Sequence, residues 1–207
     1  MIDYLSRHPE RIWVPFVQHI QILLIVLVLS VALASLLTVL SIQWKGLGQA
    51  LNHAFSVIYS IPSLALFAIL IPVTGLGMKT AVIVLVAYNQ YLLLRNFLTG
   101  LNEVDPAVIE AARGIGMTEM QTLFRVRVPL AKGALFAGIR LAVVSTIGIG
   151  TIAASINAGG LGTLLFDGLR TMNTAKILWG SLLSAGLAIL MNGLLKLAED
   201  RMGGKRT

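Results

Sequence analysis

The sequence contains no cysteine and carries little charge for its length. The absence of cysteine excludes disulfide bonds, thiolate metal sites and a cysteine nucleophile. Only 12% of the 207 residues are charged and 57% are hydrophobic, whereas soluble domains average about 25% charged residues. These proportions exclude a water-soluble globular enzyme, a disordered chain and, despite a formal net charge of +7, a nucleic-acid binder.

Five long stretches of the chain are almost free of charge. A helix needs roughly 20 apolar residues to cross the hydrocarbon core of a bilayer. Runs of about this length occur at residues 22–42, 54–73, 80–98, 141–166 and 177–195. The runs do not alternate polar and apolar residues, which disfavours a transmembrane β-barrel. The sequence therefore predicts an all-α integral membrane protein with about five transmembrane helices.

The basic residues predict the orientation of these helices, because short cytoplasmic connections carry an excess of lysine and arginine. We predict a single N-out, C-in transmembrane domain over residues 1–207. It has an external tail at 1–20, a cytoplasmic loop between helices three and four at 99–132 and a cytoplasmic tail at 196–207. The ten inner residues are Lys45, Arg95, Arg113, Arg125, Arg127, Lys132, Lys196, Arg201, Lys205 and Arg206. The five outer ones are Arg7, Arg11, Lys79, Arg170 and Lys176.

The long polar connection at residues 99–132 contains two helix-start signals. Asp105 followed by Pro106 is typical of an N-cap and a first helical position. Thr118 and Gln121 have the spacing of a capping box. The connection is therefore predicted to hold two short helices.

Glycines separate these two helices, and apolar residues give each of them one face. Gly114 and Gly116 predict an elbow, and Pro129 is expected to end the segment before the fourth transmembrane helix. The pattern fits either a loop lying on the bilayer or a docking element for a soluble partner. The apolar residues are Val108, Ile109, Ala112, Ile115, Met120, Leu123 and Phe124.

One motif in this connection resembles that of a known transporter family. Residues 110–112 read Glu-Ala-Ala, Gly116 follows after three residues, and Val126-Arg127-Val128-Pro129 follows after nine more. This spacing resembles the EAA motif of ABC importer permeases, from which it departs only by valines in place of isoleucine and leucine. The chain looks most like permeases for the osmoprotectants glycine betaine, carnitine and choline, and methionine importer permeases share several features. Further similarity lies in Ser60-Ile61-Pro62-Ser63-Leu64-Ala65, Leu94-Arg95-Asn96 and Asn157-Ala158-Gly159-Gly160-Leu161-Gly162.

The resemblance implies a multi-pass subunit of a type I importer in a bacterial cell membrane. In this family two permease subunits, identical or homologous, form the path, and an extracellular or periplasmic binding protein delivers the substrate. The EAA segment inserts as a coupling helix into a cytoplasmic ABC ATPase. The chain itself has no glycine-rich phosphate loop with lysine, so ATP and magnesium belong on that ATPase and this subunit is non-catalytic. The residues expected at the ATPase contact are Glu110, Ala111, Ala112, Gly116, Met117 and Thr118.

Three polar clusters within the apolar runs are candidates for the translocation path or its gate. Pro62 removes a backbone hydrogen bond and predicts a kink in the helix. The hydroxyls of the flanking serines can donate to the carbonyls that the proline leaves free. Tyrosine rings in the third run offer faces to a quaternary ammonium group, although hydrogen bonding between helices explains the same residues. Small and hydroxyl residues in the fourth run suit close crossing at a subunit interface. The candidates are Ser60, Pro62, Ser63, Tyr88, Asn89, Tyr91, Ser145, Thr146 and Thr151.

Other functions receive less support. The alternative of an ion-coupled secondary transporter needs an intramembrane carboxylate, and the predicted spans contain no Asp or Glu. An intramembrane protease needs a Ser–His or paired-Asp arrangement, which the spans lack. His8, His19 and His53 lie near predicted interfaces without ligand spacing, so we expect no metal site. We expect Arg140 to extend its guanidinium to the cytoplasmic headgroups.

Overall fold

A computed structural model describes residues 9–44 and 46–203, which form helices joined by short connections, with no β-strand among them. Part of the predicted tails, His8 and the basic residues at 7, 45, 205 and 206 lie outside this described part. The elements are α2 (Glu10–Gln43), α3 (Leu47–Ser60), α4 (Ser63–Thr74), α5 (Met78–Asn102), α6 (Pro106–Gly114), α7 (Glu119–Thr122), the π-helix η1 (Leu123–Arg127), α8 (Val128–Ile152), the 3-10 helix η2 (Ala153–Ile156), α9 (Leu161–Arg170) and α10 (Thr174–Gly203).

The number of membrane-spanning helices agrees with the prediction. Four helices of the described part are long and apolar enough to cross a membrane, namely Glu10–Gln43, Met78–Asn102, Glu119–Ile156 and Thr174–Met202. The pair α3 and α4, bent by 98° at its break, makes a fifth crossing if it counts as one span. The predicted all-α membrane fold is confirmed.

The helix bounds differ from the apolar runs. Residues 10–20 and 196–203, in the two predicted tails, are helical and continuous with α2 and α10. The run 141–166 is divided between α8, η2 and α9, because the chain turns back at Asn157, Gly159 and Gly160, which all have positive φ. Glycine adopts such a conformation without steric cost. Hydropathy does not reveal this turn, since α9 begins with the apolar residues Leu161, Leu164, Leu165 and Phe166.

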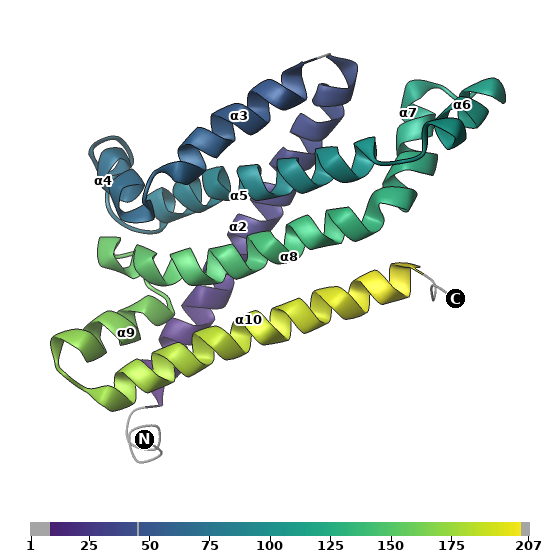
Figure 1. The fold of residues 1–207 in the computed structure, drawn as a ribbon. Coiled ribbons are helices and arrows are strands. Elements are labelled where there is room, and N and C mark those ends of the chain that lie inside the picture. The colour runs from purple at the N-terminus through teal and green to yellow at the C-terminus, as the bar shows by residue number, and fades with distance from the viewer. Residues whose placement is uncertain (1–8, 45, 204–207) are drawn as a thin grey trace.

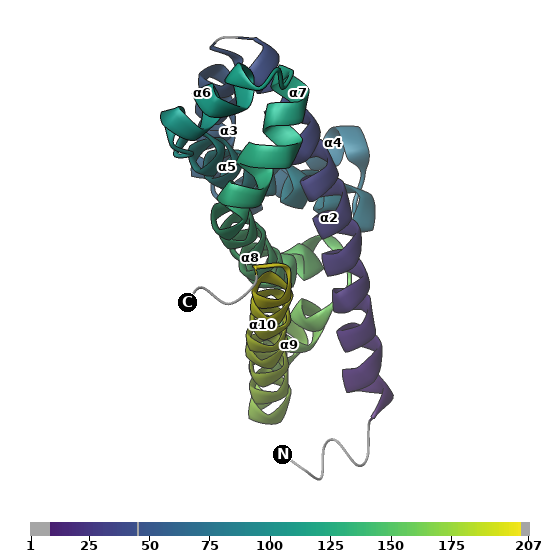
Figure 2. The ribbon, with the colours of Figure 1, turned by 90° about the vertical axis from the view of Figure 1, so that its right-hand side faces the viewer.

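Three long helices run side by side along the molecule. In Figure 1, α5 and α8 lie antiparallel, α10 follows the other side of α8, and α2 crosses behind them. Figure 2 shows α2 along one side of the molecule. The short helices α6 and α7 lie at one end, whereas α4 and α9 lie at the opposite end. The long connection predicted at 99–132 therefore projects from one end of the bundle.

Small residues bring α5 and α8 close together. A Cβ atom added at Gly138 of α8 would lie 2.8 Å from the Cβ of Asn96 on α5, a distance that side chains do not tolerate. Leu93 and Phe97 of α5 pack with Ala142 of α8 and Ala34 of α2 in one buried cluster. Without a hydrophobic driving force in lipid, such close contact is what holds membrane helices together.

The outside of the bundle is covered with large apolar side chains. Val28 of α2 is 67% exposed, Val73 of α4 82% and Ile189 of α10 74%. A water-soluble monomer rarely exposes so much apolar surface. This surface suits lipid tails and neighbouring membrane subunits.

One expectation about polar residues in the spans is wrong. Arg140 of α8 forms an ion pair with Glu199 near the end of α10 instead of extending to headgroups. The partner lies 59 residues away in sequence, so the local pattern could not indicate it. His19 is buried inside the protein at 1% exposure.

Candidate functional site

The first helix of the 99–132 connection begins as predicted. The carboxylate of Asp105 accepts a hydrogen bond from the backbone N–H of Ala107 at 2.8 Å, and Pro106 occupies the first turn of α6. An N-cap of this kind satisfies one of the free N–H groups at a helix start. The sequence therefore fixes where α6 starts.

The end of α6 is fixed by a glycine in the left-handed region. Gly116 has φ +83°, and its N–H donates to the carbonyl of Arg113 at 2.9 Å. The N–H of Met117 donates to the carbonyl of Ala112 at 3.1 Å. These two bonds form a Schellman motif with Gly116 at the position that glycine favours. The predicted elbow is confirmed at this residue.

The helix after the elbow is capped twice and linked back to α6. The Thr118 hydroxyl accepts from the N–H of Gln121 at 3.3 Å, and the Gln121 side chain accepts from the N–H of Thr118 at 2.9 Å. This reciprocal pair is the predicted capping box. Arg113 and Glu119 form an ion pair across the elbow. Backbone and side-chain bonds therefore define the angle between α6 and α7.

The elbow presents a mixed surface of small, acidic and apolar side chains. Glu110 and Ala111 are exposed, and so is Ile115, whose side chain is 77% exposed. Ala112 is buried and faces the rest of its own chain, and Met117 is half-buried. Four of the six residues predicted at the ATPase contact are thus accessible, namely Glu110, Ala111, Gly116 and Thr118. Ile115, which was not predicted there, is also accessible.

The connection to the fourth span differs from the prediction. Pro129 does not end the segment, because α7, η1 and α8 form one continuous helix over Glu119–Ile156. In η1 the N–H of Val128 donates to the carbonyl of Leu123, five residues back. This wider turn accommodates a proline ring that would clash with the carbonyl four residues earlier in an α-helix. The elbow is consequently joined directly to a transmembrane helix.

The second span is broken at Ile61 and Pro62 rather than kinked. The helices on either side meet at 98°, and the Tyr88 hydroxyl of α5 donates to the carbonyl of Ile61. The carbonyl that Pro62 frees, that of Ile58, accepts from the N–H of Ile61 at 3.1 Å, whereas the Ser60 hydroxyl donates to the carbonyl of Ser56 at 2.8 Å, so Ser60 does not satisfy it as expected. Ser63 begins α4. The break is larger than predicted, and the Tyr88 hydroxyl of a neighbouring helix satisfies the Ile61 carbonyl that it exposes.

Three tyrosines gather beside this break. The ring of Tyr59 on α3 lies 5.5 Å from Tyr88, edge to face, and 5.0 Å from Tyr91. The Arg95 guanidinium donates to the Tyr91 hydroxyl at 2.7 Å and lies 5.8 Å from the centre of its ring. The cluster therefore already holds one cation against an aromatic face, which is a cation–π geometry. Tyr59 was not predicted, since only its spatial neighbours single it out.

Asn89 connects three helices in the middle of the bundle. Its Nδ2 donates to the hydroxyls of Thr146 on α8 at 2.8 Å and Ser30 on α2 at 3.2 Å. Gln90 beside it donates to the carbonyl of Ser30 at 3.2 Å. All four side chains are buried. This arrangement matches the alternative of hydrogen bonding between helices for Asn89 and Thr146.

The exposed face of α8 carries the remaining predicted path residues. Thr151 donates to the carbonyl of Gly148 at 2.8 Å, and a Cβ at Gly148 would meet nothing within 4 Å. Ser145 is half-buried, whereas Val144 beside it is exposed. This face is open within the single chain, so another subunit or a substrate path can lie against it.

Two residues of α2 that the sequence did not identify hold the turn before α9. His19 Nδ1 accepts from the N–H of Leu161 at 3.3 Å, and Gln18 Oε1 accepts from the N–H of Gly160 at 3.2 Å. The partners lie 142 residues apart in sequence. A Cβ at Gly150 would lie 3.2 Å from the His19 ring, so this glycine makes room for the imidazole.

Charged side chains link α9 to α10 at the end opposite the elbow. Lys176 Nζ lies 2.5 Å from Asp167 Oδ2, and Arg170 Nη2 lies 3.2 Å from Oδ1. The hydrogen bond from Lys176 holds the pKa of the Asp167 carboxyl below its usual value, with Arg170 assisting and partial burial opposing. No group of three or more His, Asp or Glu residues that could hold a metal occurs among the residues described.

Comparison with known proteins gives both a family and a fold. Residues 45–204 match the family of binding-protein-dependent transport system inner membrane components. The osmoprotectant import permease protein OsmW of Salmonella typhimurium is 37% identical over 183 residues, 86% of this chain and 85% of that protein. The choline transport system permease protein OpuBB of Bacillus subtilis is 34% identical over 203 residues, 98% of this chain and 93% of that protein.

A solved structure has the same fold. An inward-facing form of the MetNI methionine ABC transporter contains a chain that superposes with a TM-score of 0.78 at 19% identity. The superposition covers 93% of this chain and 94% of the other. The chain therefore belongs to the family of binding-protein-dependent transport system inner membrane components, as a multi-pass permease of a bacterial plasma membrane.

Proposed function

We propose that this chain is the permease subunit of an ATP-driven ABC importer for quaternary-amine osmoprotectants such as glycine betaine, carnitine or choline. The two relatives are named for osmoprotectant and choline transport, and each is more than 30% identical over most of this chain. The methionine transporter shares the fold at only 19% identity. The alternative of a methionine or amino-acid substrate therefore has weaker support than the quaternary amines.

The construction of the elbow is the observation that carries this proposal. The Schellman motif at Gly116 and the capping box at Thr118 fix a rigid tip at one end of the bundle. The tip exposes Glu110, Ala111 and Ile115 and continues through η1 into α8. An exposed apolar anchor among small residues is the kind of surface that a helix places in a groove. We assign this tip to the groove of a separate cytoplasmic ATPase, which requires the N-out, C-in orientation.

The other partners are assigned to the other open faces. The exposed face of α8 at Gly148 and Thr151, together with the broken span at Pro62, suits contact with a second permease subunit, identical or homologous. The end that carries α4 and α9 lies opposite the elbow and faces the external substrate-binding protein in this orientation. The path candidates Ser60, Ser63, Ser145 and Thr151 lie on or beside these faces.

The aromatic cluster supports the choice of substrate class. Choline, carnitine and glycine betaine each carry a trimethylammonium group, which aromatic faces attract. Tyr59 is 37% exposed and lies against Tyr91, so its ring is accessible beside the break in the second span. We assign Tyr59 and Tyr91 to transient contact with the substrate, and Tyr88 to support of the break.

Copurification tests the proposal. A tagged chain coexpressed with the ABC ATPase and binding protein of its transport system should retain the ATPase through purification in detergent. In proteoliposomes the complex should take up labelled choline or glycine betaine, and excess unlabelled methionine should not compete. Failure to retain the ATPase would contradict the importer assignment. If unlabelled methionine competes and unlabelled quaternary amines do not, the transported substrate is an amino acid.

A further inference from the structure

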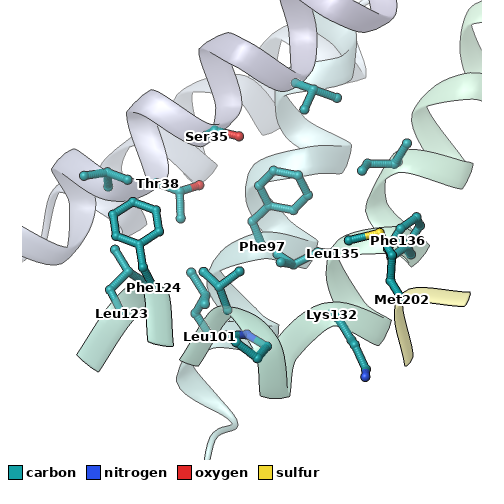
Figure 3. A pocket seen from close by; sticks show the side chains of 15 residues that line it. Ser35, Thr38, Phe97, Leu101, Leu123, Phe124, Lys132, Leu135, Phe136 and Met202 are labelled. Carbon is teal, nitrogen blue, oxygen red and sulfur yellow. The ribbon is translucent and has the colours of Figure 1, made fainter. Parts of the chain in front are cut away.

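A polar cavity of about 400 Å³ lies beside the elbow, where α2 and α5 end and α3 begins. It is distinct from the apolar cavity of about 590 Å³ between α2, α5 and α8, which Figure 3 shows. The polar cavity is lined by side chains from four elements. Asn52 of α3, Asn102 of α5 and Arg127 of η1 are among them, and Arg127 is the one charged residue in the lining.

Arg127 carries a charge that no described carboxylate neutralises. Its Nη2 donates to Asn102 Oδ1 over a long 3.5 Å, and its Nε is buried without a partner. On the same cavity, the Oδ1 of Asn52 is buried and has no donor. Buried polar groups in native proteins nearly always have partners, and an unmade bond costs stability. Two polar groups at the cavity, a donor on Arg127 and an acceptor on Asn52, therefore remain free to bond a ligand that offers both an anion and a hydroxyl.

The depth of the cavity in the membrane follows from its neighbours. Trp44 directly follows the end of α2, between the lining residues Ile42 and Gly46 in sequence, and is 59% exposed. Tryptophan concentrates at the level of the lipid headgroups. Two apolar spans, α2 and α5, also end at the cavity. The cavity thus opens at the height where phosphate groups of the bilayer lie.

We propose that this cavity binds the phosphate of an anionic phospholipid headgroup. The Arg127 guanidinium donates to the phosphate oxygens, which is a strong charge-assisted bond. A glycerol headgroup also supplies hydroxyls, one of which donates to Asn52 Oδ1. Phosphatidylglycerol meets both requirements, whereas phosphatidylcholine has no hydroxyl donor and no net negative charge. None of the residues that line the cavity is among those assigned to the transported substrate or to the ATPase contact.

Lipid binding to two arginine variants tests the proposal. The full chain in detergent is titrated with phosphatidylglycerol or phosphatidylcholine, and bound lipid is counted by native mass spectrometry. Arg127→Gln should weaken phosphatidylglycerol binding by about 10- to 100-fold, as expected for loss of a hydrogen bond to a charged group. Arg125→Gln removes the same charge two residues away from an exposed side chain that does not line the cavity, and should change nothing. Equal loss in both variants would overturn the site.

Two further arms keep the proposal testable if Arg127→Gln fails to fold. Asn52→Asp keeps the size of the side chain and adds a negative charge to the cavity, so it should also weaken phosphatidylglycerol binding. Unchanged binding in that variant would contradict the placement. Inorganic phosphate at millimolar concentration should not displace the lipid. Displacement would show that the site takes free phosphate and would overturn the lipid assignment.

Discussion

Arg113 Nη2 and Glu119 Oε1 lie 2.8 Å apart, on either side of the left-handed residue Gly116. Both side chains are more than half exposed, at 56% and 61%, so this pair contributes at most about 1 kcal/mol. The shape of the elbow therefore depends mainly on its backbone. The bonds from Gly116 and Met117 to the end of α6 are the decisive ones.

Gly116→Trp should weaken ATPase association, and both transport and substrate-stimulated ATP hydrolysis should fall. Expression and membrane insertion should stay largely intact. A Cβ at this position meets nothing within 4 Å in the single chain, so the indole extends from an open surface toward the partner. Gly116→Ala is the matched control, since it adds only the cost of a positive φ, about 1–2 kcal/mol. Glu110→Ala should give a milder defect. Normal copurification and transport by Gly116→Trp would show that the elbow is only a surface connection.

The orientation is testable with single cysteines, because the chain has none of its own. Thr118→Cys at the elbow should be protected from a membrane-impermeant thiol reagent in intact cells. Met172→Cys, in the connection between α9 and α10 and 87% exposed, should react readily, because α9 lies at the end opposite the elbow. The reverse labelling pattern would establish an inverted topology and place the elbow outside the cell.

Gly148→Leu should impair assembly or transport, because it adds bulk to the open face of α8. Gly186→Leu of α10 is the matched control: a Cβ at either glycine meets nothing within 4 Å. Gly186 lies among exposed aliphatic residues such as Leu182 and Ile189, where lipid accommodates a leucine. Uptake and recovery of the complex are the readouts. Wild-type values for Gly148→Leu would remove α8 from the subunit interface and the path.

Tyr88→Phe should lower stability by about 1–3 kcal/mol, because the carbonyl of Ile61 at the break loses its partner inside the bundle. Tyr91→Phe removes a hydroxyl that only accepts from the exposed Arg95, so its effect should be smaller. Thermal unfolding of both variants in detergent measures the difference. Equal melting temperatures would mean that the Tyr88 hydroxyl does not support the break.

The Asp167–Lys176 pair predicts a dependence of stability on pH. Because the folded-state pKa of Asp167 is lowered, its contribution is present above the usual carboxyl pKa and is lost as the pH falls below it. Lys176→Met should therefore reduce the melting temperature at neutral pH and flatten its decline in acid. Arg170→Gln should have a smaller effect, since Arg170 is more exposed. An unchanged acid profile in Lys176→Met would contradict the assignment.

Local signals predicted the elbow well. The cap at Asp105, the glycine at 116 and the capping box at Thr118 each depend on contacts within five residues, which the sequence displays. Apolar runs likewise predicted the number of spans, because the bilayer sets a minimum length.

Distant contacts account for what the sequence could not predict. The kink expected at Pro62 is a full break, and the Tyr88 hydroxyl that bonds the Ile61 carbonyl there comes from 27 residues away. His19 is buried against the turn before α9, and its partner Leu161 lies 142 residues away in sequence. The division of the run 141–166 also depends on packing, as α9 folds back against α8 and α10. Residue spacing carries no information about such pairs.

ATP-dependent uptake tests the central claim most directly. Proteoliposomes containing this chain, its ATPase and its binding protein should accumulate labelled choline or glycine betaine only when ATP is hydrolysed. A non-hydrolysable ATP analogue should abolish accumulation, and collapse of proton and sodium gradients should leave it intact. Accumulation that continues without ATP hydrolysis and stops when the ion gradients collapse would contradict the account and indicate an ion-coupled transporter.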